Sequence, residues 1–279
     1  MAEQLVGAEW LARRLEDKEL VIADCRFELK DAKAGRKQYK QGHIPGAVYF
    51  DLEEDLSGPI GEHGGRHPLP DIDDFVIKLG HSGIDQTKQV VVYDDQNGSF
   101  AARLWWMLRY LGHDNVSVLD ISFSKWMEEG YPVSSEMPHP EKCEFVPHVN
   151  PEMVIDIEGV KEEMGREKVM LIDSRAPERY HGETEPIDPK AGHIPGAFNR
   201  FWKENVGDDG KWKTPDELKQ QLQWLENKDL IVYCGSGVTA NANVLALKSI
   251  GKEARLYIGS WSDWSSYSEN PVATREEPN

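Results

Sequence analysis

The sequence predicts an α/β protein built from two copies of one domain, each a mainly parallel sheet flanked by helices. Three observations lead to this fold class: the length of the chain, an ordered internal repeat, and alternating strand and helix patterns within each repeat. The chain has 279 residues, which is about twice the length of a typical domain. Hydrophobic residues make up 39% and charged residues 29%, a composition typical of a soluble globular protein.

The internal repeat consists of sequence blocks that recur in the same order in the two halves of the chain. The matched pairs are LVIADCR at 20–26 and VMLIDSR at 169–175, GHIPGA at 42–47 and again at 192–197, residues 89–120 and 229–258, and the Ser- and Trp-containing segments that end at Trp126 and Trp264. Six identical letters inside an ordered set of blocks indicate a tandem duplication.

The boundary between the copies lies in a proline-containing stretch without periodicity, around residues 134–151. We therefore expect an N-terminal domain at 1–135, a linker at 136–150 and a C-terminal domain at 151–279. Cys143 lies in this linker, and we expect no chemical role for it.

Within each copy, short apolar runs alternate with helical patterns. VVVY at 90–93 and LIVY at 230–233 are typical of strands buried on both faces. Residues 101–111 and 240–250 place apolar side chains at helix spacing, and each pattern ends at a glycine. This alternation predicts a parallel sheet covered by helices, in which ligands bind at the carboxyl ends of the strands.

Charge and cysteine content exclude several classes of function. The formal net charge is −17, so we expect neither nucleic acid nor an anionic membrane as a partner. No apolar run reaches the roughly 20 residues needed to cross a bilayer, and residues 1–17 are typical of an amphipathic helix rather than a secretory signal. Three cysteines without C-x-x-C spacing argue against a disulfide framework and a zinc site. We expect a cytoplasmic protein without a metal or cofactor.

The segment CGSGVTA at 234–240 follows the buried strand of the second copy and precedes its helix. Its glycines allow the backbone to curl, so that successive N–H groups face one point, and the helix that begins near Thr239 adds the positive end of its dipole. These donors favour the thiolate form of a cysteine at this point. The sequence therefore predicts a nucleophile, Cys234, in an anion-binding loop. Its other members are Gly235, Ser236, Gly237, Val238 and Thr239.

Four other interpretations of this segment compete with a nucleophile. A buried core cysteine is the ordinary alternative, and Cys25 keeps that interpretation. A dinucleotide fingerprint, Gly235-x-Gly237-x-x-Ala240, is disfavoured because too little chain follows it for the remaining strands. A cysteine phosphatase needs an arginine where this chain has Ala240.

A cysteine protease, the fourth alternative, would need a histidine base. His43 and His193 lie in both copies of the repeat, whereas only one copy has the cysteine. We therefore expect both histidines to be structural, each bonded to backbone in a turn.

On these motifs the chain resembles the rhodanese superfamily of sulfurtransferases, two-domain type. The resemblance rests on both GHIPGA hexapeptides, the strand ends ADCR and IDSR, the paired segments VVYDDQNGSFAAR and IVYCGSGVTA, and GSWSDW near the end. It implies that the N-terminal domain is catalytically inactive. Aligning Tyr93 with Tyr233 places Asp94 opposite Cys234, and a carboxylate cannot carry a sulfur atom.

The resemblance also implies a mechanism. The Cys234 thiolate takes a sulfur atom from a small anionic donor, becomes a persulfide, and passes the sulfur to cyanide, a thiol or a protein thiol. Family members that use thiosulfate have basic residues directly after the cysteine, whereas those that use 3-mercaptopyruvate resemble CGSGVTA. We therefore expect 3-mercaptopyruvate, with thiosulfate as the alternative donor. A partner module that delivers persulfide sulfur to another protein remains a further alternative.

Family resemblance assigns roles to residues outside the loop. Arg179 matches an arginine that binds the donor carboxylate, and its ordinary alternative is an ion pair. Some relatives carry a second arginine before GHIPGA, where this chain offers only Lys190 as an imperfect substitute.

Three further side chains, Ser236, His67 and Asp51, resemble a polar set that protonates the leaving enolate. A solvent-facing loop histidine is the alternative for His67. We expect Arg103 and Arg175 to brace their domains.

Overall fold

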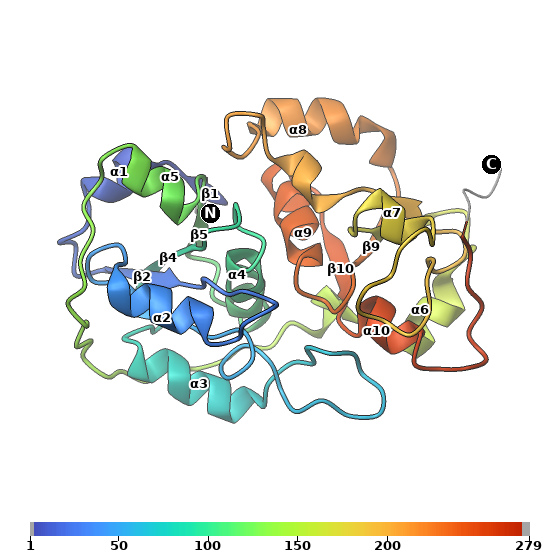
Figure 1. Cartoon of the computed structure of the whole chain (residues 1–279), viewed down its shortest axis with the longest axis horizontal. Helices are drawn as coiled ribbons and strands as arrows, with labels where there is room; N and C mark the ends of the chain where they lie inside the picture. Colours follow the sequence, from blue (N-terminus) through green and yellow to red (C-terminus); the bar gives the residue numbers. More distant parts are fainter. Residues whose placement is uncertain (1–2, 275–279) are drawn as a thin grey trace. The chain divides into compact units, whose positions relative to one another are not determined.

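The computed structural model describes residues 3–274, and these form two compact units (Figure 1). Unit 1 contains residues 3–58, Leu69–Asn150 and Val206–Trp212. Unit 2 contains Pro59–Pro68, Pro151–Asn205 and residues 213–274. Each unit therefore includes one short segment from the opposite half of the chain.

Unit 1 has a five-stranded parallel sheet in the order β1-β5-β4-β2-β3. Its strands are β1 (Leu5–Val6), β2 (Leu20–Asp24), β3 (Val48–Tyr49), β4 (Gln89–Tyr93) and β5 (Val116–Leu119). Its helices are α1 (Ala8–Ala12), α2 (Ala34–Gln41), α3 (Ile72–His81), α4 (Ala101–Tyr110) and α5 (Phe123–Glu128).

Unit 2 repeats this arrangement in the order β6-β10-β9-β7-β8, again entirely parallel. Its strands are β6 (Val154–Ile155), β7 (Val169–Asp173), β8 (Phe198–Asn199), β9 (Asp229–Tyr233) and β10 (Ala254–Tyr257). Its helices are α6 (Ile157–Glu163), α7 (Pro177–Tyr180), α8 (Pro215–Leu222), α9 (Ala240–Ser249) and α10 (Ser260–Trp264), with 3-10 turns at Pro151–Met153, Trp202–Asn205 and Gln223–Leu225. The predicted fold class is confirmed.

The two sheets share the same register at their centres. Asp24 pairs with Tyr93 in unit 1, and Asp173 pairs with Tyr233 in unit 2. The residue that follows β4 and the residue that follows β9 therefore occupy the same place at the carboxyl edges of their sheets. That residue is Asp94 in unit 1 and Cys234 in unit 2, as the sequence alignment predicts.

Helices α4 and α9 are the most deeply buried, because the first eight residues of each are all buried. Most of their residues are apolar or small, as expected for helices enclosed by protein, and the polar residues Arg103, Asn241 and Asn243 are buried as well. Both end where a glycine takes a positive φ, +82° at Gly112 and +77° at Gly251. The surface helix α8 begins instead with a capping box between Thr214 and Glu217.

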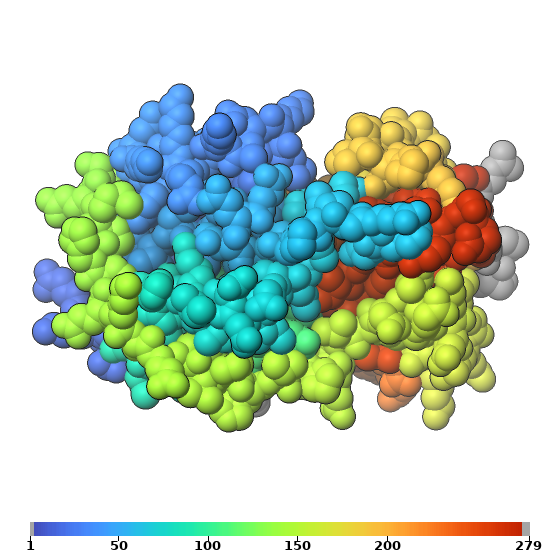
Figure 2. Space-filling model, turned by 90° about the horizontal axis from the view of Figure 1, so that it is seen from below, coloured from blue at the N-terminus to red at the C-terminus, as the bar shows by residue number. Residues whose placement is uncertain are grey.

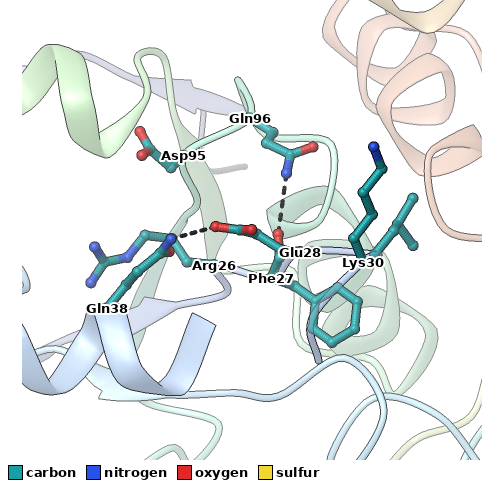
Figure 3. Close-up of a pocket in the computed structure, with 8 residues that line it drawn as sticks. Arg26, Phe27, Glu28, Lys30, Gln38, Asp95 and Gln96 are labelled. Atoms are coloured by element: carbon teal, nitrogen blue, oxygen red, sulfur yellow. Dashed lines mark hydrogen bonds between the residues drawn. The ribbon is translucent and has the colours of Figure 1, made fainter. Parts of the chain in front are cut away.

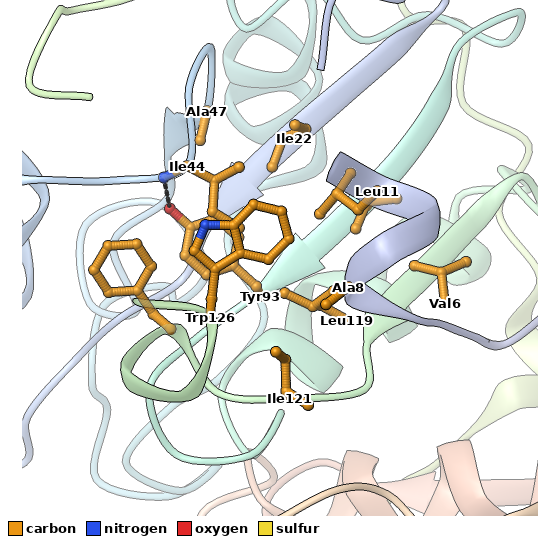
Figure 4. Packing of buried hydrophobic residues seen from close by; sticks show 12 residues of the cluster. Val6, Ala8, Leu11, Ile22, Ile44, Ala47, Tyr93, Leu119, Ile121 and Trp126 are labelled. Atoms are coloured by element: carbon orange, nitrogen blue, oxygen red, sulfur yellow. Dashed lines mark hydrogen bonds between the residues drawn. The ribbon is translucent and has the colours of Figure 1, made fainter. Parts of the chain in front are cut away.

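A cluster of buried apolar side chains packs on each sheet, and Figure 4 shows the cluster of unit 1 around Trp126 and Tyr93. The indole N–H of Trp126 donates to the Pro132 carbonyl at 2.8 Å, and that of Trp264 donates to the Pro271 carbonyl at 2.9 Å. The repeated tryptophans thus serve one structural purpose, which is to fix the chain that follows the last helix of each unit.

The two GHIPGA turns are held by their histidines and by Arg26 and Arg175, which follow β2 and β7. The Nδ1 atom of His43 lies 2.7 Å from the Tyr39 carbonyl oxygen, and that of His193 lies 2.7 Å from the Tyr180 carbonyl oxygen. Arg175 pairs with Asp173 and donates to the Gly192 carbonyl at 2.6 Å. The structural interpretation of both histidines, and the bracing role of Arg175, are confirmed.

Among residues 3–274, no helix combines the length and apolar character needed to span a membrane. Within the same residues, no group of three or more His, Cys, Asp or Glu side chains is placed to hold a metal ion.

Candidate active site

Cys234 lies directly after β9, in a loop that α10 holds from one side. Its backbone N–H donates to the Ser260 hydroxyl at 3.1 Å, and its carbonyl accepts from the Trp261 N–H at 3.0 Å. The next carbonyl, that of Gly235, accepts from the Ser262 N–H at 2.8 Å. The thiol itself is almost completely buried, with 1% of the residue exposed.

Gly237 sets the curl of this loop. Its φ is +72°, in the left-handed region that other residues rarely adopt. A Cβ atom at this position would lie 2.2 Å from the Ile258 carbonyl oxygen. Conformation and close packing therefore both require glycine here.

The carbonyl groups of the loop are held by Asn241, in the first turn of α9. Its side-chain amide donates to the Gly237 carbonyl at 2.9 Å and to the Val238 carbonyl at 2.8 Å. Among residues 3–274, no acceptor is found for the N–H groups of Gly235, Ser236, Val238 and Thr239. Buried N–H groups are nearly always paired in folded proteins, so this set is suited to receive an anion.

The matching loop of unit 1 shows what such N–H groups bind. Oδ1 of Asp94 accepts from the N–H groups of Gln96 and Gly98, at 2.7 and 2.8 Å. Oδ2 accepts from those of Phe100 and Ala101, at 2.7 and 2.9 Å. Burial raises the pKa of Asp94, and these four donors act in the opposite direction. In unit 1 these N–H groups thus bind a carboxylate of the protein itself, that of Asp94, and no thiol is present at this position.

A surface pocket of about 390 Å³ adjoins this part of unit 1 (Figure 3). It is lined by residues that follow β2 and β4, among them Arg26, Asp95 and Gln96. Gln38 and Gln96 donate across it to the Glu28 carboxylate and the Phe27 carbonyl. The pocket is thus crossed by hydrogen bonds from two glutamine side chains, and no cysteine lines it.

The other two cysteines lie in surroundings that disfavour a thiolate. Burial, followed by the charge of Asp24, raises the pKa of the Cys25 thiol well above its ordinary value. Partial burial also raises the pKa of Cys143, whose Sγ lies 3.6 Å from the Gly80 carbonyl oxygen.

The segment Pro59–Pro68 belongs to unit 2 and packs on α10 and the residues that follow it. The Gly64 N–H donates to the Asp263 carboxylate at 2.8 Å, and the His63 ring stacks on Tyr267 at 3.8 Å between ring centroids. Figure 2 shows this segment in light blue against the red C-terminal residues. It brings His67 to the Cys234 loop, where Nδ1 lies 2.8 Å from the Ser236 hydroxyl, and both side chains are buried.

Arg179, from α7, also lies against this loop. Its guanidinium donates to Glu185 at 2.7 and 3.0 Å and to Asp188 at 3.1 Å, so the ion pair considered as its alternative is present. A Cβ atom at Gly235 would lie 3.4 Å from Arg179 Nη1. Arg179 therefore forms this ion pair and also lies beside the Cys234 loop.

Sequence reasoning missed Arg66, whose Nη2 would lie 3.2 Å from the same Cβ position. The only signal was its place next to His67 in RHPLP, far along the chain from the loop. Lys190 is committed elsewhere, because its amino group donates to the Tyr267 carbonyl at 2.6 Å.

Asp51 lies in unit 1, where 4% of the residue is exposed. Its carboxylate accepts from the Tyr49 hydroxyl at 3.3 Å and lies 3.8 Å from the Arg36 guanidinium. It also accepts from the N–H groups of Glu53 and Glu54. Its part in proton transfer stays a prediction.

Comparison with known proteins identifies the family. The family described as rhodanese-like domain matches residues 7–129 and 156–267, one region for each half of the chain. The chain belongs to the rhodanese family. This two-domain rhodanese is 42% identical to a probable 3-mercaptopyruvate sulfurtransferase of Pseudomonas aeruginosa, over 97% of its own length and 98% of that protein. It is 36% identical to the thiosulfate sulfurtransferase of Rattus norvegicus, over 97% and 94% of the two chains.

Solved structures agree with this assignment. The crystal structure of a 3-mercaptopyruvate sulfotransferase from Escherichia coli matches this rhodanese with a TM-score of 0.82 and 35% identity, over 94% of this chain and 100% of the other. The 3-mercaptopyruvate sulfurtransferase from Leishmania major matches with a TM-score of 0.84 and 26% identity, over 97% of this chain and 76% of the other. The predicted class of enzyme, a sulfurtransferase, is confirmed.

Proposed function

We propose that this rhodanese transfers sulfur from 3-mercaptopyruvate to a thiophilic acceptor through a persulfide on Cys234. One observation carries the proposal: a cysteine sits among backbone N–H groups for which no acceptor is found in residues 3–274, beside the Arg179 guanidinium. The 42% identity to a protein named for this donor supports the choice of substrate.

The reaction proceeds in two displacements. The Cys234 thiolate attacks the thiol sulfur of 3-mercaptopyruvate, an S–S bond forms, and the C–S bond breaks. The leaving group departs as the enolate of pyruvate and takes up one proton. The N–H groups of Gly235, Ser236, Val238 and Thr239 stabilise the thiolate and then the persulfide anion, with Gly237 shaping the loop. Cyanide, a small thiol or a protein thiol then attacks the outer sulfur, and the Cys234 thiolate is restored.

His67 and Ser236 are the proton-handling pair in this proposal. Their contact of 2.8 Å gives a path from the imidazole through the hydroxyl toward the leaving group. Asp51 is the third member of the set that the family resemblance assigns to proton transfer, and its part in this reaction is a proposal.

Thiosulfate is the second candidate donor. Arg66 and Arg179 place two cations beside Gly235, which suits a dianion as well as a carboxylate. A relative at 36% identity is named for thiosulfate. A third possibility is a module that receives the persulfide and delivers it to a partner protein.

The remaining features follow the sequence. We propose a catalytic domain at 151–279, an inactive domain at 1–135 and a linker at 136–150, in a cytoplasmic protein without cofactor, metal, nucleic acid or membrane partner. The net charge of −17 is the basis for excluding polyanionic partners.

The test is steady-state sulfur transfer with 3-mercaptopyruvate and thiosulfate in parallel, each paired with cyanide and with a thiol. We expect a higher kcat/KM with 3-mercaptopyruvate, and a preference for thiosulfate would reverse the donor assignment. Activity with neither donor would favour the protein-to-protein carrier. Cys234→Ser should abolish turnover, whereas Cys25→Ser and Cys143→Ser should retain it, and loss in all three would contradict a single nucleophile.

A further inference from the structure

The carbonyl groups of the Cys234 loop decide which way its N–H groups point. The peptide bonds of the loop are trans, so each carbonyl points away from the N–H group of the residue that follows it. A contact that fixes a carbonyl therefore also fixes the direction of the next N–H group. The four N–H groups for which no acceptor is found in residues 3–274 follow the carbonyls of Cys234, Gly235, Gly237 and Val238.

Two of these carbonyls are held by the backbone of α10. The Trp261 N–H donates to the Cys234 carbonyl at 3.0 Å, and the Ser262 N–H donates to the Gly235 carbonyl at 2.8 Å. These contacts orient the first half of the loop, with the N–H groups of Gly235 and Ser236. Because both donors are backbone groups, this half of the loop needs no particular side chain to hold it.

The other two carbonyls are held by one side chain, that of Asn241. Its amide nitrogen donates to the Gly237 carbonyl at 2.9 Å and to the Val238 carbonyl at 2.8 Å. Only the nitrogen of an amide can pair with a carbonyl oxygen, so these two contacts fix the orientation of the amide. The Val238 carbonyl also accepts from the backbone N–H of Asn241, at a longer distance of 3.2 Å. The second half of the loop, with the N–H groups of Val238 and Thr239, thus depends on one amide group.

Asn241 is completely buried, and its amide oxygen has no hydrogen-bond partner among residues 3–274. A buried polar atom without a partner lowers the stability of a fold, and most such atoms in proteins are paired. An apolar side chain at this position would avoid the unpaired oxygen. The donor end of the amide is therefore what this position requires, and the loop uses both of its N–H groups.

Unit 1 shows that the buried helix itself does not require this asparagine. The second residue of α4 is Ala102, whereas the second residue of α9 is Asn241. In unit 1 the Asp94 carboxylate binds four N–H groups of its own loop and so holds that loop from the inside. Cys234 offers one sulfur atom in place of two oxygens, so its loop needs an anchor on the outside.

We propose that Asn241 is a positioning residue of the active site, which turns the N–H groups of Val238 and Thr239 toward Cys234 by holding the carbonyls that precede them. Donors that are already oriented stabilise a thiolate or a persulfide without rearrangement of the loop during the reaction. The inference rests on the proposed function for the identity of the anion, a persulfide, but not for the orientation of the loop.

The test is the pH dependence of Cys234 alkylation by iodoacetamide, because the thiolate is the reactive form and the reagent is uncharged. Mass spectrometry of the Cys234 peptide gives the rate constant at each pH in the full-length protein. Asn241→Ala removes both side-chain donors. Asn241→Ser keeps one, because a serine in a helix can donate to the carbonyl three or four residues before it.

Asn243→Ala is the matched control, because Asn243 is a second buried asparagine of α9. Its amide also donates twice, to the Ser174 hydroxyl at 2.9 Å and to the Arg200 carbonyl at 2.7 Å. Neither acceptor belongs to the Cys234 loop. This variant therefore removes two comparable hydrogen bonds from the same helix and leaves the carbonyls of the loop in place.

We expect the midpoint of the alkylation profile to rise by about 1 pH unit in Asn241→Ala and by about half as much in Asn241→Ser. Asn243→Ala should lower the urea midpoint of unfolding at least as much as Asn241→Ala does, but leave the alkylation midpoint unchanged. The charged and titratable groups beside the loop, Arg66, Arg179 and His67, are the same in every variant, so a difference between profiles reports the N–H groups.

An unchanged alkylation midpoint in Asn241→Ala overturns the proposal. An equal rise in Asn243→Ala also overturns it, because any loosening of α9 would then have the same effect. If Asn241→Ala does not fold, Asn241→Ser decides, and an unchanged midpoint in that variant rejects the positioning role.

Turnover separates this inference from the proposed function. With the preferred donor, Asn241→Ala should lower kcat/KM by about 10-fold at neutral pH. A raised alkylation midpoint in a protein that transfers sulfur from neither donor would uphold the positioning role and reject the proposed function. Sulfur transfer with an unchanged kcat/KM and an unchanged alkylation midpoint would reject the positioning role alone.

Discussion

Replacing Gly237 by alanine tests whether the loop around Cys234 depends on one backbone conformation. The added Cβ would meet the Ile258 carbonyl oxygen at 2.2 Å and its carbonyl carbon at 3.0 Å. Ordinary contact begins at 3.4 Å, so loop or strand must shift by about 1 Å. The left-handed φ of +72° costs alanine about 1–2 kcal/mol, and the overlap adds about 1–3 kcal/mol. We therefore expect a loss of about 2–5 kcal/mol in unfolding free energy.

Gly196→Ala is the matched control in the same unit. Gly196 has a similar φ of +78°, but nothing lies within 4 Å of the added Cβ. It should lose only the conformational part, about 1–2 kcal/mol, and keep its activity.

The assay is urea unfolding of both variants, with kcat/KM for sulfur transfer measured at a temperature where both are folded. Gly237→Ala should lose about 100-fold in kcat/KM, because a displacement near 1 Å at a reacting group is enough for that effect. Equal stability and equal activity of the two variants would refute the reasoning that the Ile258 contact fixes the loop.

Three further outcomes are expected. Ser236→Ala removes the hydroxyl that contacts His67, so kcat with 3-mercaptopyruvate should fall about 10-fold. The rate of Cys234 alkylation by iodoacetamide should stay unchanged. An equal fall in kcat and in the alkylation rate would indicate a structural role for Ser236. Asp94→Asn turns one carboxylate oxygen that accepts two N–H groups into an amide donor, so urea unfolding should show a loss of about 2–4 kcal/mol. The neighbouring Asp95 is partly exposed and, among residues 3–274, binds only Ser124, so Asp95→Asn should lose less than about 1 kcal/mol. Burial lowers the pKa of His113 below its ordinary value of 6.5, so on acidification the unfolded chain takes up this proton before the folded protein does. The free energy of unfolding should therefore fall as the pH drops below about 6.5. His113→Gln should make the free energy of unfolding depend less steeply on pH.

The fold could be predicted because each half carries strong local patterns. The runs at 90–93 and 230–233 lie within β4 and β9, and the helix patterns at 101–111 and 240–250 match α4 and α9 to within a residue or two. Buried parallel strands and fully enclosed helices leave continuous apolar stretches, which sequence periodicity detects.

The Cys234 loop could be predicted for the same reason, since its chemistry lies in seven consecutive residues. Arg66 could not, because nothing in Pro59–Pro68 indicates that the segment packs with residues of the other half. The contacts of this segment include hydrogen bonds to Ser262 and Asp263 and a ring stack on Tyr267, and such contacts leave no periodic signal in the sequence. Such a long-range contact can be recognised only from the three-dimensional structure.

Because each unit includes a segment from the other half, deleting one half of the chain would also affect the unit that remains. The first half has Asp94 where the second half has Cys234, but it is not a dispensable copy. Here deletion of the first half would also remove Arg66 and His67, and the second half would lack two side chains that lie against its own loop. Unit 1 depends in turn on Val206–Trp212, where the Trp212 indole N–H donates to the Asn97 carbonyl at 3.0 Å. We therefore expect either half, expressed alone, to lack a segment that belongs to its own unit.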